Sequence, residues 1–209
     1  MTTAIPNSST LAMNLWSERR YPALRAVLLV LVGSALLIIS AKIKVPFYPV
    51  PMTLQTFAVM AIAAAYGSRL AVATVLVYLA EGLVGLPVFT NTPPAIAGPA
   101  YFLGPTGGFL MGFVVAALIV GIAADRNHDR SPVRLFLYML VADIVLFALG
   151  FIWLAWFAQL SSGANGLGLA SAWSNGVLPF LLADLVKIAL AACLIPAAWL
   201  VVKPKPEAM

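Results

Sequence analysis

The chain has 209 residues, of which 63% are hydrophobic and only 9% are charged, and its formal net charge is +5. Soluble domains carry charges on about a quarter of their residues, so this composition excludes an ordinary soluble globule and indicates a membrane protein. The single cysteine and single histidine cannot supply the ligand cluster of a structural zinc site, and we expect neither a metal nor a cofactor. Most basic residues lie in or beside predicted connections, which favours membrane orientation over nucleic-acid binding as the meaning of the charge.

Length and apolar stretches predict six transmembrane helices with short connections, although the second is short for a bilayer span. We expect one all-α transmembrane domain at 24–202, preceded by a segment at 1–23 and followed by a tail at 203–209. Leu11, Leu15 and Trp16, beside charged residues, form a candidate interfacial helix in the first segment. The six helices are predicted at residues 24–41, 52–66, 70–83, 105–124, 135–160 and 177–202.

Three connections are longer than simple turns. The first contains Pro46, Pro49 and Pro51, and three prolines in six residues exclude a helix. The second, residues 86–104, combines Pro and Gly with apolar residues, so we expect it to pack back on the helices as a lid or a re-entrant plug. The third, residues 161–176, is rich in Ser, Gly and Asn and is expected to be a loop.

Small residues recur every four positions in the fourth predicted helix. Gly104, Gly108, Gly112 and Ala116 give one smooth helix face on which another helix can approach closely. We favour packing within the chain over a seam between two copies.

The distribution of Lys and Arg predicts that both termini are cytoplasmic. In a six-span topology nine of the twelve basic residues lie on the side of the termini, and only Lys42 and Lys44 lie on the other side. Cytoplasmic loops are enriched in Lys and Arg. The three long connections are therefore expected to face outward and to form the entrance of a binding site.

An acid and a base in the last predicted helix require an explanation. Asp184 and Lys187 are three residues apart and so share one helix face. A charged residue at the bilayer centre costs about 2.5–3.5 kcal/mol on insertion scales, which favours a pair that faces a cavity. A desolvated Lys suits a substrate carboxylate, and an Asp suits ligand N–H donors.

Other polar and aromatic residues are predicted at the same outer level. Thr53 and Gln55 open the second helix, and Glu81 lies near the outer end of the third. Aromatic residues on the outer connections suit an apolar part of a ligand. The candidate substrate-binding residues are Asp184, Lys187, Gln55, Thr53, Tyr48, Phe89, Asn91, Tyr101 and Glu81.

Other interpretations of the charged residues stay open. Lys187 could pair only with Asp184 or with Asp143, as a helix clamp in a structural subunit. An intramembrane enzyme could use Asp184, Asp143 or Glu81 as an acid or base. The sequence contains neither a Gly-x-Ser-x-Gly nor a His-Glu-x-x-His motif, so we do not expect an enzyme.

Four sequence blocks resemble the BioY family, the substrate-binding S-components of energy-coupling-factor (ECF) biotin transporters. They occur in the order of the family between about residues 35 and 192. The blocks are Pro49-Val-Pro-Met-Thr-Leu-Gln-Thr56, Tyr78 with Gly82-Leu-Val-Gly-Leu-Pro-Val-Phe89, Leu103-Gly-Pro-Thr-Gly-Gly-Phe-Leu110, and Asp184-Leu-Val-Lys187.

The resemblance implies an S-component-like bundle with cytoplasmic termini in the inner, or plasma, membrane of a bacterium. It implies biotin as the ligand, bound near the outer face under the loop between the third and fourth helices; another vitamin is the alternative. The implied partners, besides the lipid bilayer, are the ECF transmembrane coupling subunit and ATPase subunits, or a second copy in a homodimer. The family's Ala-x-x-x-Ala docking face is replaced here by Ser34-Ala-Leu-Leu-Ile38.

Overall fold

The structure, a computed structural model, describes residues 10–15, 22–95 and 97–202. The predicted tail and most of the predicted N-terminal segment, including Trp16, lie outside the described residues, so the domain limits stay predictions. The elements in chain order are α1 (Leu11–Leu15), α2 (Pro22–Lys42), β1 (Lys44–Val45), β2 (Met52–Thr53), α3 (Gln55–Tyr66), α4 (Ser68–Leu83), α5 (Pro99–Leu103), α6 (Gly107–Asp125), η1 (His128–Arg130), α7 (Pro132–Ile152), η2 (Trp153–Phe157), α8 (Leu169–Gly176) and α9 (Leu181–Val201).

Four of the described helices are long and apolar enough to cross a membrane: α2, α6, α9, and α7 together with its continuation η2. The expected class, a helical membrane protein, is therefore confirmed. α3 has 12 residues and α4 has 16, which correspond to lengths of about 18 Å and about 24 Å. Both are shorter than the hydrocarbon layer of about 30 Å, so the expected number of six spans stays a prediction, as does the side of the termini.

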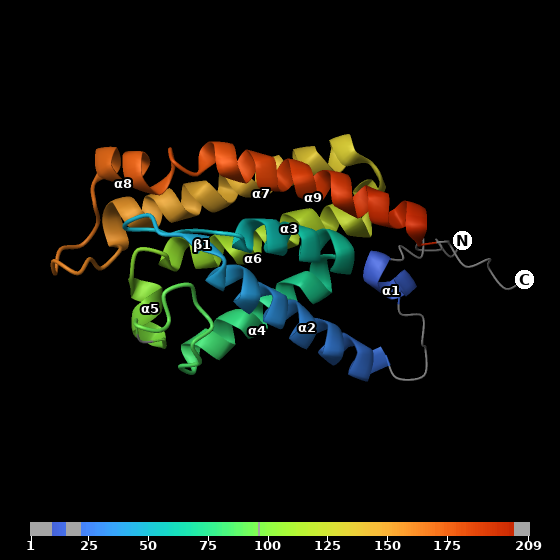
Figure 1. Ribbon diagram of the computed structural model, residues 1–209, viewed down its shortest axis with the longest axis horizontal. Helices are drawn as coiled ribbons and strands as arrows, with labels where there is room; N and C mark the ends of the chain where they lie inside the picture. Colours follow the sequence, from blue (N-terminus) through green and yellow to red (C-terminus); the bar gives the residue numbers. More distant parts are fainter. Residues whose placement is uncertain (1–9, 16–21, 96, 203–209) are drawn as a thin grey trace, which may run out of the picture.

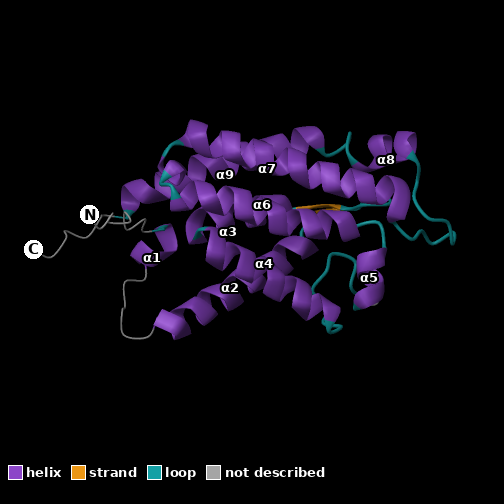
Figure 2. Ribbon diagram, turned by 180° about the vertical axis from the view of Figure 1, so that it is seen from behind, coloured by secondary structure: helices purple, strands orange, loops and turns teal. Residues whose placement is uncertain are grey.

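The long helices form a bundle around the short helix α3. α6 and α9 each run beside α7, whereas α2 and α4 lie on the opposite side of the bundle (Figure 1, Figure 2). α3 lies between these groups and packs on α2, α4, α6 and α9. The β-hairpin, α5 and α8 gather at one end of the molecule, and α1 and the last turns of α9 lie at the other (Figure 1). The three long connections therefore meet at one end.

The small-residue face of α6 packs against α7. A Cβ atom added to Gly108 would meet the backbone oxygen of Leu149, and one added to Gly112 would meet Leu146. Both contacts require the close helix approach that the four-residue repeat predicts. That prediction is confirmed, and the helix that approaches belongs to the same chain.

A single residue, Gly67, turns the chain between α3 and α4 with a φ of +77°. Glycine adopts positive φ without steric cost. Asp125, at the end of α6, accepts hydrogen bonds from the backbone N–H of Ser68 at 3.2 Å and from its hydroxyl at 2.5 Å. The carboxylate thus satisfies a free N–H at the start of α4 and ties the turn to α6.

The connections contain more regular structure than the sequence predicts. β1 and β2 pair Lys44 with Thr53 and Val45 with Met52, so the proline-rich stretch is the turn of a hairpin. Residues 52–53, expected to open the second helix, belong to this hairpin instead. The expected loop at 86–104 contains α5, and the expected loop at 161–176 contains α8.

Several helix limits also differ from the predicted ones. α9 begins at Leu181 rather than at residue 177, because Pro179 disfavours helical geometry at the residue before it. α6 begins at Gly107, after a break at residues 104–106 that separates it from α5. α7 ends at Ile152 and continues as a π-helix to Phe157, so the helix predicted to reach residue 160 stops earlier.

We expect Gly121→Val to destabilise the bundle. A Cβ at Gly121 would collide with the backbone of Ser68, and overpacking of this kind costs about 1–3 kcal/mol. Thermal unfolding in detergent should show a lower midpoint for this variant. Leu118→Phe adds volume on the same helix where the side chain is 45% exposed and should leave the midpoint unchanged; equal midpoints for both variants would contradict the expected close packing.

Candidate functional site

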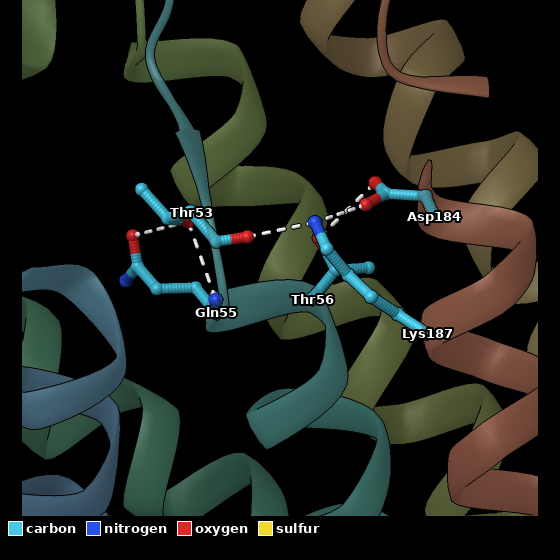
Figure 3. A network of polar contacts seen from close by, with 5 residues as sticks. All are labelled: Thr53, Gln55, Thr56, Asp184 and Lys187. Carbon is cyan, nitrogen blue, oxygen red and sulfur yellow. Dashed lines mark hydrogen bonds and ion pairs between the residues drawn. The ribbon is translucent and has the colours of Figure 1, made fainter. Parts of the chain in front are cut away.

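Asp184 and Lys187 form an ion pair within a polar network between α9 and the start of α3 (Figure 3). The Nζ of Lys187 lies 2.5 Å from Oδ1 of Asp184 and donates a second hydrogen bond, of 2.7 Å, to the backbone carbonyl of Thr53. Thr56 donates its hydroxyl to Oδ2 of Asp184 at 3.2 Å. The side chains of Lys187 and Asp184 are only 15% and 3% exposed, so the pair is largely enclosed by the protein.

The position of the pair follows from where α9 begins. Asp184 lies in the first turn of α9, where free backbone N–H groups and the helix dipole favour a carboxylate. Lys187 follows three residues later on the same face. Both side chains therefore point from α9 toward the start of α3 (Figure 3).

Thr53 and Gln55 lie on the α3 side of this network. β2 ends at Thr53 and α3 begins at Gln55, so the change from strand to helix places both residues beside the ion pair. The hydroxyl of Thr53 accepts a hydrogen bond from the backbone N–H of Gln55 at 3.2 Å. The Nε2 of Gln55 donates to the hydroxyl of Tyr78 at 2.8 Å, which links α3 to α4.

A cavity lies beside the network, and its empty volume is about 550 Å³ including its opening to solvent. Its lining combines the ion pair with hydroxyl, amide and aromatic groups. Six of the nine predicted site residues contribute to it: Thr53, Gln55, Phe89, Tyr101, Asp184 and Lys187.

Aromatic rings line the cavity, and two of them, Phe89 and Tyr101, come from the segment predicted to be a lid. Phe89 is only 1% exposed and stacks on Tyr101 with ring centroids 4.5 Å apart and an interplanar angle of 16°. It also makes edge contacts with Phe102 and Tyr78 at centroid distances of 5.4 and 5.5 Å. Stacked and edge-on arrangements of this kind stabilise aromatic clusters, so the wall is preformed.

Two lysines hold the lid segment against the end of α2. The Nζ of Lys42 donates hydrogen bonds to the backbone carbonyls of three lid residues at 2.8, 2.6 and 2.5 Å: Pro87, Phe89 and Thr92. The Nζ of Lys44 donates to the carbonyl of Thr90 at 3.0 Å and to Oδ1 of Asn91 at 2.8 Å. This lysine clamp, Lys42 with Lys44, fixes the backbone that carries Phe89 over the cavity.

The structure places the other three predicted site residues away from the cavity lining. Asn91 accepts the hydrogen bond from Lys44 within the clamp. Tyr48 is 77% exposed, with its hydroxyl 3.5 Å from that of Ser161. Glu81 accepts a hydrogen bond of 2.5 Å from Ser34, which joins α4 to α2.

Several lining residues are absent from the predicted set. Thr56 and Tyr78 could have been predicted as site residues, because both lie in the sequence blocks that resemble a known family. Thr90 lies beside Phe89, but nothing in the sequence distinguishes it from its neighbours. Phe147 and Phe180 line the cavity from α7 and the turn before α9, and their spacing in apolar helices gives no signal that separates them from ordinary core residues.

The arrangement suits reversible binding of a small molecule that has both polar and apolar parts. The ammonium of Lys187 can receive a carboxylate, the hydroxyl and amide groups can make directional hydrogen bonds, and the rings can cover an apolar moiety. Within the described residues, no group of three His, Cys, Asp or Glu side chains could hold a metal ion. Fold and site together define a helical membrane protein with a small-molecule cavity near one end of its bundle.

Comparisons with known proteins agree with this class. The sequence model of the BioY family matches residues 9–204, so the chain belongs to the BioY family and is a multi-pass protein of the plasma membrane. The probable biotin transporter BioY of Pyrococcus horikoshii is 36% identical over 167 residues, which cover 80% of this chain and 91% of that protein. The biotin transporter BioY of Thermotoga maritima is 32% identical over 163 residues, which cover 76% and 86%.

A solved structure shares the fold. The S-component for biotin from an ECF-type ABC transporter superposes with a TM-score of 0.71 and 25% sequence identity, over 90% of this chain and 96% of that one. The family expected from the four sequence blocks is therefore confirmed, and so is the similarity of the bundle to an S-component.

We expect replacement of Lys187 alone to be more damaging than replacement of the whole ion pair. Lys187→Met leaves Asp184 buried without its counter-ion, a loss of about 3–5 kcal/mol for enclosed pairs. The double variant Asp184→Leu with Lys187→Met removes both charges and should recover most of the lost stability. Chemical denaturation in mixed micelles measures the free energy of unfolding of both variants. A double variant as unstable as the single one would show that the two charges are not coupled.

Proposed function

We propose that the chain is the biotin-binding S-component of an uptake system and that it captures biotin at the outer face of the membrane. The observation that carries this proposal is the largely buried ammonium of Lys187 in a cavity lined by polar and aromatic groups. Membership of the BioY family, whose relatives named above are biotin transporters, supports biotin over other small carboxylates.

The chemistry of biotin matches the two sides of the cavity. Its carboxylate suits Lys187, because a charge-assisted hydrogen bond of this kind is strong. Its ureido N–H groups, at the other end of the molecule, suit the hydroxyl and amide oxygens of the cavity lining. Its sulfur-containing ring and aliphatic chain suit Phe89 and Tyr101. In this arrangement the carboxylate of the ligand shares the ammonium of Lys187 with Asp184.

We propose that biotin enters under the segment at residues 86–104. Phe89 and Thr90 line the cavity from this segment, and the lysine clamp holds their backbone. Entry would then require the clamped segment to move, or the ligand to pass through the opening that the cavity already has.

The proposed topology has six spans, with both termini in the cytoplasm. The excess of basic residues on one side of the membrane supports it. α3 and α4 can still complete two crossings, because the extended residues before α3 add length at the outer end. The proposed partners are the ECF coupling and ATPase subunits, or a second copy of the chain; the solved structural neighbour is an S-component from a transporter of the ECF type.

The rival classes lead to different observations. An intramembrane enzyme should turn over a lipid or peptide and should lose activity when one acid is replaced. A structural subunit should keep its assembly when the Asp184–Lys187 pair is exchanged for apolar residues, and it should bind no ligand.

We expect Lys187→Met to weaken biotin binding by about 10- to 100-fold, because a hydrogen bond to a charged group contributes about 1.5–3 kcal/mol. Titration of the purified protein with biotin by calorimetry measures this change. Biotin amide, which lacks the carboxylate charge, should bind wild type more weakly than biotin does. The two ligands should bind Lys187→Met with nearly equal affinity, as expected when the removed side chain is the carboxylate's partner.

Arg134→Met is the control, because it removes an exposed cation at the start of α7 and should leave the affinity for biotin unchanged. Thermal-shift assays with a panel of vitamins test the alternative ligands. Stabilisation by another vitamin but not by biotin would contradict the proposed substrate, and stabilisation by none would contradict the proposed function.

We expect cysteine labelling to distinguish six crossings from four. In a Cys193→Ser background, a membrane-impermeant maleimide should label Val84→Cys and Ser161→Cys in right-side-out vesicles. Arg69→Cys and Arg126→Cys should react only after permeabilisation. Val84 and Arg69 flank α4, so labelling of both positions from outside would show that α4 does not cross the membrane.

A further inference from the structure

Asp143 is a buried carboxyl group with no role in the site described above. It lies in α7, its side chain belongs to a residue only 7% exposed, and its Oδ1 has no hydrogen-bond partner among the described residues. Buried polar groups are nearly always paired, and ionisable residues within membrane helices are usually functional. The unpaired oxygen therefore indicates that Asp143 binds a group that the protein itself does not supply.

Asp143 has an apolar groove on one side and the charged residues Asp184 and Lys187 on the other. A groove between α7, α8 and α9 contains Asp143 among side chains such as Ile144, Phe151 and Leu185. Phe147, one turn after Asp143, lines both this groove and the proposed biotin cavity. Asp143 is also close enough to Asp184 and Lys187 to interact with both electrostatically. The groove that contains Asp143 and the cavity that contains the ion pair thus share the ring of Phe147.

The local charges leave no counter-ion for Asp143. On α9 the facing groups are Asp184 and Lys187, and Lys187 already donates to Asp184 and to the carbonyl of Thr53. α8 contains no ionisable residue, and the only ones in α3 and α6 are their last residues, Tyr66 and Asp125.

The remaining ionisable groups near α7 lie toward its other end. Tyr138 is within hydrogen-bonding distance of His128, at 3.3 Å, and Asp129 accepts a hydrogen bond from Trp199 at 2.6 Å. Arg130 stacks on the ring of Trp199, 4.6 Å from its centroid, and Arg134 is exposed. An ionised Asp143 would therefore be a second buried anion beside one ammonium, which a low-dielectric environment strongly disfavours.

We propose that Asp143 is a proton-binding site linked to the ligand cavity, and that it holds a proton when an anionic ligand occupies the cavity. This inference rests on the proposed function, because it takes biotin as the anionic ligand. A bound carboxylate shares Lys187 with Asp184 and adds a further negative charge beside Asp143. Proton uptake from water by the Asp143 carboxylate, giving the neutral acid, keeps the number of buried anions from rising.

The linkage has a definite sign. The ligand-bound state holds more protons than the free state over the pH range in which free Asp143 is partly ionised. By linkage, affinity for biotin then rises as the pH falls and declines as the pH rises, by at most about tenfold per pH unit for one proton. A neutral ligand adds no charge beside Asp143 and should show no such dependence.

The test is calorimetric titration of the full-length wild-type protein with biotin in pairs of buffers that differ in ionisation enthalpy, from about pH 6 to about pH 9. We expect the protein to take up nearly one proton per biotin bound at the pH where the linkage is greatest. We expect no proton uptake when biotin amide binds. Asp143→Asn should still bind biotin, with uptake close to zero and an affinity that no longer depends on pH. Asp143→Leu, which matches the apolar groove, provides a second variant if the amide is not tolerated.

Asp129→Asn is the matched control. Asp129 is 1% exposed and also has an oxygen without a partner among the described residues, and burial raises its pKa. It lies between α6 and α7 rather than beside the cavity, so its replacement should leave the biotin-linked uptake unchanged. Zero uptake by wild type at every pH, or full uptake retained by both Asp143 variants, would overturn the proposal, and the second result would assign the proton to Asp184.

A measurement without ligand separates this proposal from the proposed function. Infrared spectra of the free protein should contain the band of a protonated carboxylic acid at a pH where exposed carboxylates are ionised. Asp143→Asn should remove part of that band, whereas Asp129→Asn should leave the Asp143 component. A band unaffected by Asp143→Asn would overturn the proton site even if biotin does not bind, and failure of biotin to bind would contradict only the proposed function.

Discussion

The structure depends on one buried ammonium group. Lys187 joins Asp184 on its own helix to the carbonyl of Thr53, a residue 134 positions away in the chain. A lone ammonium would be costly in this environment, so the contact between α9 and the β2–α3 junction must form for the bundle to bury it. The same enclosure makes the ammonium a strong partner for a carboxylate. In the proposed site, stability and ligand recognition therefore draw on the same group, which lies where α9 meets the β2–α3 junction.

Much of the fold follows from hydropathy and from small residues. The positions of the helices were predictable because apolar runs interrupted by Pro, Gly and charges mark membrane helices clearly. The packing of α6 on α7 followed from glycines four residues apart. The hairpin of β1 and β2 was not predictable, because two-residue strands give no periodic signal. The late start of α9 reflects Pro179, whose local effect competes with an unbroken apolar pattern.

The polar half of the site was easier to predict than the aromatic half. Asp184, Lys187, Thr53 and Gln55 stand out because polar groups are expensive inside a membrane. Phe147 and Phe180 resemble the many apolar residues that surround them, and only the folded arrangement shows that they face the cavity. Glu81 has the same chemistry as the site residues, but helix rotation turns it toward Ser34. Sequence separates polar from apolar positions; it does not determine the direction in which each helix faces.

The lysine clamp has a consequence for how this protein can vary. Lys42 binds only main-chain carbonyls, which every residue possesses, and one of them belongs to Pro87, which retains its carbonyl although it has no N–H. The side chains of the clamped segment therefore take no part in its attachment by Lys42. Substitutions there can reshape the wall above the ligand while the anchor stays in place. Apart from the hydrogen bond of Lys44 to the side chain of Asn91, anchoring of the segment and the shape of the cavity wall are thus encoded separately.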